Sequence, residues 1–202
     1  MIKSLFKHAF GHPSGVVGWI GGMIMARTNQ EVARQSIELL DVQPRDLVLD
    51  IGCGPGVSIQ LLSPYVSSGW VVGLDPSQEM VKQATRRNAN DIGRGKAEIR
   101  RGVAERLPFE NATFDKVLAI NSMHVWPDAL AGLREVERVL KPGGKVVLGF
   151  TRHASQSQDG LVELLTAAGF TDAKVLDNHE NFYAYATHHS QNNEGVNDPH
   201  KW

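Results

Sequence analysis

Short runs of apolar residues alternate along the chain with segments in which apolar residues recur every three or four positions. The short runs predict strands at residues 47–51, 70–74, 97–101, 114–120, 145–150, 173–176 and 182–187. The helical spacing predicts helices that begin near residues 29, 57, 77, 127 and 161. The second of these is expected to reach Val66, and the polar residues 90–95 predict a loop.

This alternation predicts an α/β fold with a doubly wound, Rossmann-like sheet, in which most strands are parallel and joined by right-handed crossovers. The last two predicted strands have no helix between them, so they must pair antiparallel and one strand near an edge is reversed. We predict one domain over residues 29–187, preceded by a separate leader at 1–28 and followed by a disordered tail at 188–202.

Composition and charge limit which classes of binding partner and which cellular compartment the sequence predicts. The formal net charge is −1, with 21 Lys and Arg against 22 Asp and Glu. This balance predicts no nucleic-acid partner, although a local basic patch is compatible with a neutral total. The lone cysteine, Cys53, suits a reducing compartment. No signal peptide is visible, and the apolar stretch Val16–Ala26 is shorter than the roughly 20 residues of a spanning helix, so we expect a cytoplasmic protein.

Three glycines at alternate positions join the first predicted strand to the next helix. Gly52 permits a backbone conformation closed to other residues, while Gly54 and Gly56 let a ligand approach the main chain. Nineteen residues after Gly56, the second strand ends at Asp75, where a carboxylate can accept hydrogen bonds from ribose hydroxyls. Together these features predict a ligand that contains a nucleoside.

Asp50 and the glycine spacing favour S-adenosylmethionine (SAM) over a dinucleotide. The third glycine comes one residue earlier than in the dinucleotide fingerprint G-x-G-x-x-G. A carboxylate at Asp50 would repel a pyrophosphate but suits a ligand that ends in an ammonium group beside a sulfonium. The histidines lack the clustering of a metal site, so no metal is expected.

Five motifs then appear in a characteristic order: Asp50–Gly56 (DIGCGPG), Gly73–Ser77 (GLDPS), Ala104–Phe109 (AERLPF), Phe114–Asp115 (FD) and Leu140–Gly144 (LKPGG). Over about residues 40–187 the chain resembles the class I SAM-dependent methyltransferases, in particular the ubiquinone/menaquinone-biosynthesis-like branch (methyltransferase type 11). The resemblance implies a seven-stranded sheet with its last strand reversed, and S-adenosylhomocysteine as the product of SAM.

The resemblance also implies a role for individual residues in holding SAM. Asp50 and the loop Gly52–Gly56 would hold the methionine part, Asp75 the ribose, and Ser77 or Met80 the adenine. Ala104 and Glu105 would line the adenine edge, and Asn121 would close over the ligand. The branch commonly has an aspartate where this chain has Val103, so recognition of the adenine amino group should depend on backbone groups near Ala104. The full expected set is Asp50, Gly52, Cys53, Gly54, Gly56, Asp75, Pro76, Ser77, Met80, Val103, Ala104, Glu105 and Asn121.

His124 and Trp126 follow the fourth predicted strand, on the side expected to face the methyl acceptor. His124 is the candidate catalytic residue, since an imidazole can orient or deprotonate an acceptor hydroxyl. A structural histidine at this junction is the competing interpretation. Arg152 and His153 follow the fifth strand, where a solvated loop is favoured over an anion-binding role.

The leader at residues 1–28 has two interpretations. Trp19 and Met23 would contribute to a hydrophobic lid over the acceptor, or the apolar residues would form a helix on a membrane surface. A surface helix is usually rich in Lys and Arg, whereas Arg27 is the only such residue close by, so the lid is favoured.

The predicted function is methyl transfer from SAM by in-line displacement to a small acceptor, either apolar or quinone-like. The activated sulfonium leaves the protein mainly the tasks of positioning and excluding water. Two alternatives remain open: a lipid-headgroup methyltransferase at a membrane surface, and a non-catalytic SAM-binding protein.

Overall fold

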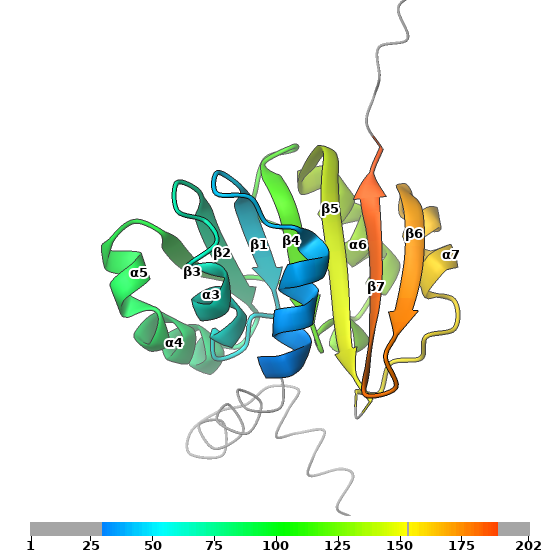
Figure 1. Ribbon diagram of the computed structural model, residues 1–202, viewed down its shortest axis with the longest axis horizontal. Coiled ribbons are helices and arrows are strands. Elements are labelled where there is room, and N and C mark those ends of the chain that lie inside the picture. The colour runs from blue at the N-terminus through cyan, green and yellow to red at the C-terminus, as the bar shows by residue number, and fades with distance from the viewer. Residues whose placement is uncertain (1–29, 153, 190–202) are drawn as a thin grey trace, which may run out of the picture.

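The computed structural model describes residues 30–152 and 154–189, which form a three-layer α/β unit around a seven-stranded sheet (Figure 1). The expectations for the leader, including Trp19 and Met23, for His153 and for most of the tail lie outside the described residues. The strand order is β3-β2-β1-β4-β5-β7-β6. The strands are β1 (Leu47–Ile51), β2 (Trp70–Asp75), β3 (Ala97–Arg101), β4 (Phe114–Ile120), β5 (Leu140–Thr151), β6 (Phe170–Asp177) and β7 (Asn181–His188).

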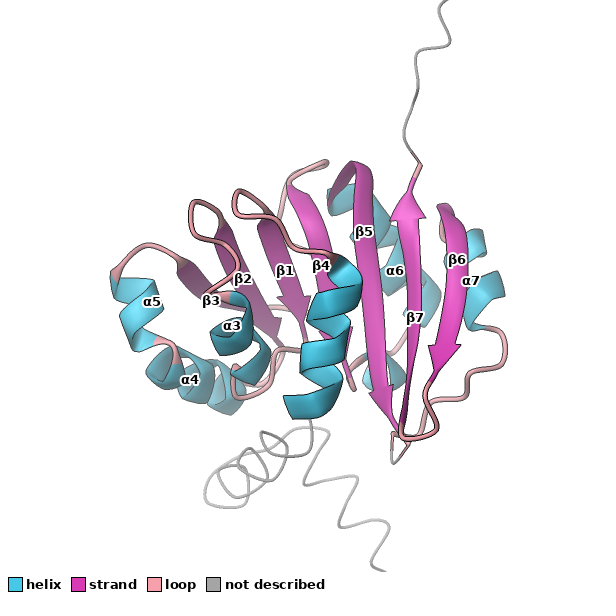
Figure 2. Ribbon diagram, viewed as in Figure 1, coloured by secondary structure: helices cyan, strands magenta, loops and turns pink. Residues whose placement is uncertain are grey.

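Helices cover both faces of the sheet (Figure 2). A helix over residues 30–40 lies on the same face as α3 and α4, and α6 and α7 lie on the other. Both faces of β1 are buried: Val48 packs with the first group of helices and Leu49 with the second. The helices are α3 (Val57–Leu62), α4 (Gln78–Arg87), α5 (Ala89–Gly93), α6 (Ala129–Val139) and α7 (Leu161–Ala167), with a short 3₁₀ helix, η1 (Met123–Val125).

The predicted fold class, including the reversed last strand, is confirmed. Strand β7 lies between β5 and β6 and pairs antiparallel with both. The parallel pairs β1–β2, β1–β4, β2–β3 and β4–β5 make up the rest of the sheet. All carboxyl ends except that of β7 therefore meet at one edge, and the loops that follow β1 to β5 share it.

Several local predictions were wrong. Strand β6 begins at Phe170 instead of Ala173, and His188, expected in the disordered tail, is the last residue of β7. The loop expected at 90–95 contains α5, because Ile92 packs against the core and its N–H donates to the Asn88 carbonyl at 3.0 Å. Helix α3 ends at Leu62 instead of Val66, since Pro64 disfavours helical geometry at the preceding residue. Strand β5 begins at Leu140, directly after α6, instead of at Lys145, because Leu140 pairs with Phe114 before an irregularity in the register.

Among the described residues, no helix is long and apolar enough to cross a membrane.

Candidate active site

The loop after β1 contains three glycines with left-handed backbone. The φ angles are 71° at Gly52, 53° at Gly54 and 79° at Gly56. The loop folds back on β2, because the N–H groups of Gly52 and Cys53 both donate to the Leu74 carbonyl, at 2.7 and 3.0 Å. The backbone between Gly52 and Gly56 is thereby fixed at the carboxyl edge of the sheet.

Close neighbours also exclude side chains at two of these glycines. A Cβ atom at Gly52 would lie 2.4 Å from Cβ of Ser122, and one at Gly56 would lie 2.9 Å from Cα of Ala84. Both positions therefore require glycine for conformation and for space.

Replacing Gly52 with alanine is expected to lower the free energy of unfolding by about 2 kcal/mol. Left-handed backbone costs a non-glycine residue roughly 1–2 kcal/mol, and the new methyl group collides with Ser122. Chemical denaturation measures the loss. A double-mutant cycle with Ser122→Gly isolates the collision, and strictly additive losses would contradict it.

Asp75, at the end of β2, links the glycine loop to α4. Its Oδ2 accepts the Gly54 N–H at 2.9 Å, and its Oδ1 accepts the Ser77 N–H at 2.9 Å. Ser77 in turn caps α4 by accepting the Met80 N–H at 3.4 Å. Burial raises the pKa of Asp75 above its ordinary value, and the two backbone hydrogen bonds oppose that rise. The carboxylate is buried but still borders the loop, as the ribose assignment requires.

Asp50 is a buried carboxyl group with one unpartnered oxygen. Its Oδ2 accepts a hydrogen bond from the Ser58 hydroxyl, while no donor among the described residues reaches Oδ1. The pKa of Asp50 is raised to about 7 in all: burial raises it most, the Ser58 hydrogen bond lowers it, and the negative charge of Asp75 adds a smaller rise. A buried anion without a partner is costly, so this oxygen suits a cationic ligand group such as the SAM ammonium.

Cys53 lies inside this loop as a packing residue. Its side chain is buried, and its Sγ would lie 3.0 Å from a Cβ added at Gly73. Burial raises the pKa of the thiol, as do the charges of Asp50 and Asp75. The thiol therefore stays protonated, and Cys53 is not a nucleophile.

The residues expected around adenine lie on two neighbouring segments. Met80 is buried on α4, whereas Pro76 is exposed before it. Ala104 is buried in the loop after β3, and Val103 beside it is 46% exposed. The Glu105 side chain is directed toward the start of α6, where its Oε1 accepts the N–H of Asp128 at 3.4 Å.

Asn121 follows β4 and is held against β5. It has a left-handed φ of 46°, and its Oδ1 accepts the Thr151 N–H at 2.9 Å. Its own N–H donates to the Gly149 carbonyl at 2.8 Å. Asn121 therefore joins the ends of β4 and β5, beside the glycine loop contacted by Ser122.

His124 and Trp126 lie in different surroundings, although only two positions separate them. His124 is exposed on η1, and partial desolvation lowers its pKa below the ordinary value of 6.5. Trp126 is half-buried against α6, since a Cβ at Gly132 would lie 2.6 Å from its Cε3. A neutral, exposed imidazole is available as a proton acceptor at the carboxyl edge.

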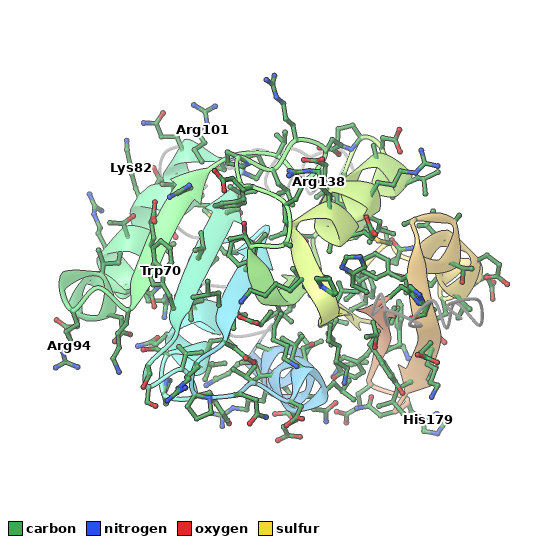
Figure 3. The ribbon with its side chains drawn as sticks, turned by 90° about the horizontal axis from the view of Figure 1, so that it is seen from above. Trp70, Lys82, Arg94, Arg101, Arg138 and His179 are labelled. Atoms are coloured by element: carbon green, nitrogen blue, oxygen red, sulfur yellow. The ribbon has the colours of Figure 1, made fainter. Side chains whose placement is uncertain are left out.

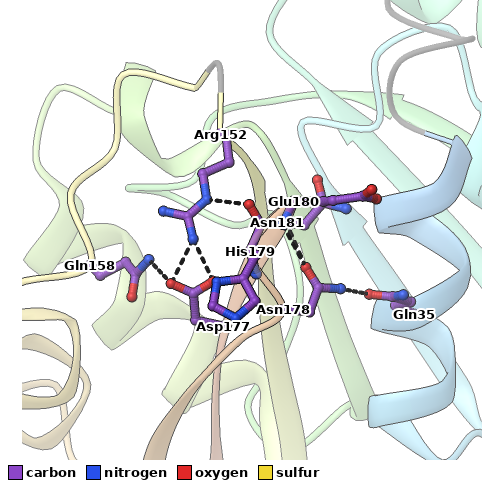
Figure 4. Close-up of polar contacts among 8 residues, drawn as sticks. All are labelled: Gln35, Arg152, Gln158, Asp177, Asn178, His179, Glu180 and Asn181. Carbon is purple, nitrogen blue, oxygen red and sulfur yellow. Dashed lines mark hydrogen bonds and ion pairs between the residues drawn. The ribbon is translucent and has the colours of Figure 1, made fainter.

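Arg152 is exposed in the turn after β5, as expected, and its side chain also holds the β6–β7 turn (Figure 4). Its guanidinium donates to both carboxylate oxygens of Asp177, at 2.6 and 2.8 Å, and to the His179 carbonyl at 2.9 Å. Asn178 donates to Gln35 of the helix over 30–40 at 2.6 Å, so the turn is also tied to that helix. Arg152 is neutralised by Asp177 and is not a free anion-binding group.

Sequence reasoning missed the residues that support the loop. Ser58 holds Asp50, and Ser122 donates from its hydroxyl to the Ile51 carbonyl at 2.8 Å. Asn88 donates to the Gly56 carbonyl at 3.0 Å, and Arg87 to the Pro55 carbonyl at 2.9 Å. Ser58 could have been found as a polar residue in the first turn after the glycines, whereas nothing in the sequence indicates Asn88.

Comparisons with known proteins decide the family. A model described as "Methyltransferase domain" matches residues 48–144. The uncharacterized methyltransferase YdaC of Bacillus subtilis is 30% identical over 164 residues, which cover 77% of this chain and 88% of YdaC. The chain belongs to the class I SAM-dependent methyltransferases.

A solved SAM-dependent methyltransferase from Aquifex aeolicus shares the fold of this methyltransferase, with a TM-score of 0.72 at 22% identity, covering 80% of this chain and 93% of that one. The demethylmenaquinone methyltransferase of Bacillus cereus (strain B4264) is 36% identical over 115 residues, or 56% of this chain. The methyltransferase spans about half of that relative, 48% of its length. In the described part of the chain, no group of three or more His, Cys, Asp or Glu is arranged to hold a metal ion.

Proposed function

We propose that this methyltransferase transfers a methyl group from SAM to a small apolar or quinone-like acceptor by in-line displacement. The observation that carries the proposal is the pair of buried carboxyl groups, Asp50 and Asp75, beside the glycine loop. One borders the loop with an unpartnered oxygen, and the other holds it by a hydrogen bond to Gly54. This pair suits a ligand with an ammonium group at one end and a ribose at the other.

Asp75 retains the capacity to bind ribose. An ionised carboxylate offers about four lone-pair positions, and the Gly54 and Ser77 N–H groups use two of them. The remaining two can accept the ribose hydroxyls. Both backbone hydrogen bonds also fix the carboxylate plane, so little rotational freedom is lost when the ligand binds.

The remainder of the SAM site is proposed from the same edge of the sheet. The glycine loop would hold the methionine chain, with Cys53 packed beneath it, and Pro76, Ser77 and Met80 would flank the adenine. Val103, Ala104 and Glu105 would border its amino edge, and Asn121 would close the site from β4. SAM supplies an electrophilic methyl on its sulfonium; the protein positions the acceptor and excludes water.

An apolar acceptor is supported by exposed apolar side chains and by a relative. Val103 and Val125, on the loops after β3 and β4, are 46% and 53% exposed. Trp126 adds an aromatic surface on the same side. The similarity to demethylmenaquinone methyltransferases favours a hydroquinone ring as the acceptor.

The proposed role of His124 is to accept the proton of an acceptor hydroxyl. Replacing His124 with glutamine is expected to lower kcat about 100-fold, since a positioned general base contributes at least that factor. The Kd for SAM should stay unchanged, because the assigned SAM contacts are elsewhere. Wild-type kcat should fall as the pH drops through the pKa of His124, which lies below 6.5.

Steady-state kinetics of His124→Gln over a pH series makes this measurement. His189→Gln serves as the matched control, because His189 is exposed on the chain after β7 and outside the proposed site. A pH profile that is the same in wild type and His124→Gln would remove His124 from catalysis.

An acceptor panel tests the proposed function. The protein is incubated with SAM that carries a labelled methyl group and with matched hydroquinones, catechols, amines and polar carboxylates, and products are identified by mass spectrometry. We expect label in the hydroquinones, with one S-adenosylhomocysteine released per product. Label only in the polar acceptors would contradict the apolar assignment. Binding of SAM without product from any acceptor would favour the non-catalytic alternative.

A further inference from the structure

The part of the molecule formed by α4, α5 and β3 carries a set of basic side chains that have no ion-pair partner among the described residues. They come from α4, from the segment that joins α5 to β3, and from the end of β3, and they are Lys82, Arg86, Arg87, Arg94, Lys96 and Arg101. We refer to this surface as the basic ridge. Figure 3 labels three of them: Lys82 and Arg101 lie along one side of this part, and Arg94 lies at its far corner, before β3 begins.

The ridge concentrates positive charge in a chain whose net charge is −1. The ion pairs within 4.0 Å among the described residues include none of the ridge side chains. Of the acidic residues in the same stretch, Glu98 is paired with Arg100, which leaves Glu79 on α4 and Asp91 on α5 as counter-charges against six cations. On α4 the ridge runs from Lys82 to Arg87, which is about 7.5 Å along the helix axis.

The ridge borders the proposed SAM site. Arg87 donates to the Pro55 carbonyl at 2.9 Å, and Arg101 donates to the Pro76 carbonyl at 3.0 Å. Both carbonyl groups belong to loops that are proposed to bind SAM. Val103 lies two residues beyond Arg101 and is 46% exposed, so an apolar side chain adjoins the cations. A partner on the ridge would therefore lie beside the opening of the site.

We propose that the basic ridge docks the methyltransferase on an anionic lipid bilayer. Clustered cationic side chains complement anionic headgroups, and each Lys or Arg near the surface contributes to the attraction. The inference rests on the proposed function, because an apolar acceptor partitions into such a bilayer. Single-stranded RNA is disfavoured, since it is usually held by exposed aromatic rings, and Tyr65, the only largely exposed aromatic side chain in the described ranges, is not on the ridge.

The test is vesicle co-sedimentation of the full chain with phosphatidylcholine alone and with phosphatidylcholine mixed with phosphatidylglycerol. The test variant is Lys82→Gln/Arg86→Gln/Arg94→Gln. The matched control, Arg34→Gln/Arg134→Gln/Lys174→Gln, removes the same charge from exposed residues on other surfaces. We expect wild type and the control to bind mixed vesicles, and binding to weaken as salt is added.

The ridge variant is expected to bind mixed vesicles about 100-fold more weakly, at roughly fivefold for each removed cation. If the control variant bound the mixed vesicles as weakly as the ridge variant, the loss of binding would follow from net charge alone, and the proposal would be overturned. Equal binding to phosphatidylcholine alone would also overturn it. Retention of a homopolymer RNA by the ridge, without vesicle binding, would replace lipid by nucleic acid as the partner.

Turnover separates this proposal from the proposed function. A short-chain, water-soluble hydroquinone is assayed without vesicles, and the ridge variant should methylate it at the wild-type rate. Failure of wild type to methylate any hydroquinone would overturn the acceptor assignment, whereas the vesicle result would still decide the role of the ridge.

Discussion

Replacing Asp75 with alanine is expected to raise the Kd for SAM about 1000-fold. Two hydrogen bonds from ribose hydroxyls to a charged acceptor contribute about 2 kcal/mol each, and tenfold in affinity corresponds to about 1.4 kcal/mol. The same change leaves the Gly54 and Ser77 N–H groups without their acceptor, so the glycine loop is then held to β2 only by the hydrogen bonds from Gly52 and Cys53 to Leu74. Isothermal titration calorimetry measures the affinity.

Asp75→Asn separates the two causes. The asparagine oxygen can still accept the Gly54 N–H, but its amide group is neutral and cannot accept from both ribose hydroxyls. We expect an intermediate Kd. The melting temperature of the ligand-free protein should fall less than in Asp75→Ala, because the asparagine keeps the Gly54 hydrogen bond and loses only the one from the Ser77 N–H. Wild-type SAM affinity in Asp75→Ala would show that the ribose lies elsewhere.

The ligand-free protein is expected to lose stability as the pH rises, because of Asp50. Its pKa increases from 3.8 to about 7 on folding, so the folded state holds the proton more tightly than the unfolded state. The stabilisation is complete below pH 3.8 and is lost as the pH rises through about 7. One pKa unit corresponds to 1.36 kcal/mol, so the contribution is about 4 kcal/mol. The raised pKa of Asp75 acts in the same direction.

Chemical denaturation between pH 4 and pH 8 measures this change, and Asp50→Asn is the control. Asparagine has the same shape, can accept from Ser58 and does not titrate, so the decline should be smaller in the variant by the contribution of Asp50. Parallel curves for wild type and Asp50→Asn would show that Asp50 ionises normally in the folded protein.

The sheet could be predicted from the sequence because its central strands are short, mostly apolar runs. Leu47–Ile51 and Phe114–Ile120 are bounded by turn residues, and the structure has strands at those positions. The absence of a helix between the last two strands correctly predicted the reversal of β7. The wrong predictions concern segments whose conformation depends on a single tertiary contact. For example, Ile92 packs against the core, and the polar segment around it is therefore helical.

The site was predictable where backbone conformation or charge restricts the residue. Positive φ angles explain Gly52, Gly54 and Gly56, and the strand-end position explains Asp75. The supporting residues were not predictable, since Ser122 is 71 positions from Ile51 and Asn88 is 32 from Gly56. The ion pair of Arg152 was not predictable for the same reason, because its partner Asp177 comes from a distant strand.

A crystal structure of the methyltransferase with S-adenosylhomocysteine tests the central assignment most directly. We expect both ribose hydroxyl oxygens within hydrogen-bond distance of the Asp75 carboxylate, about 2.7–3.2 Å. We also expect the amino nitrogen at the same distance from Oδ1 of Asp50, the oxygen that has no donor in the described protein. A ligand that is bound away from the Gly52–Gly56 loop, or that contacts neither carboxylate, would contradict the assignment of this site to SAM.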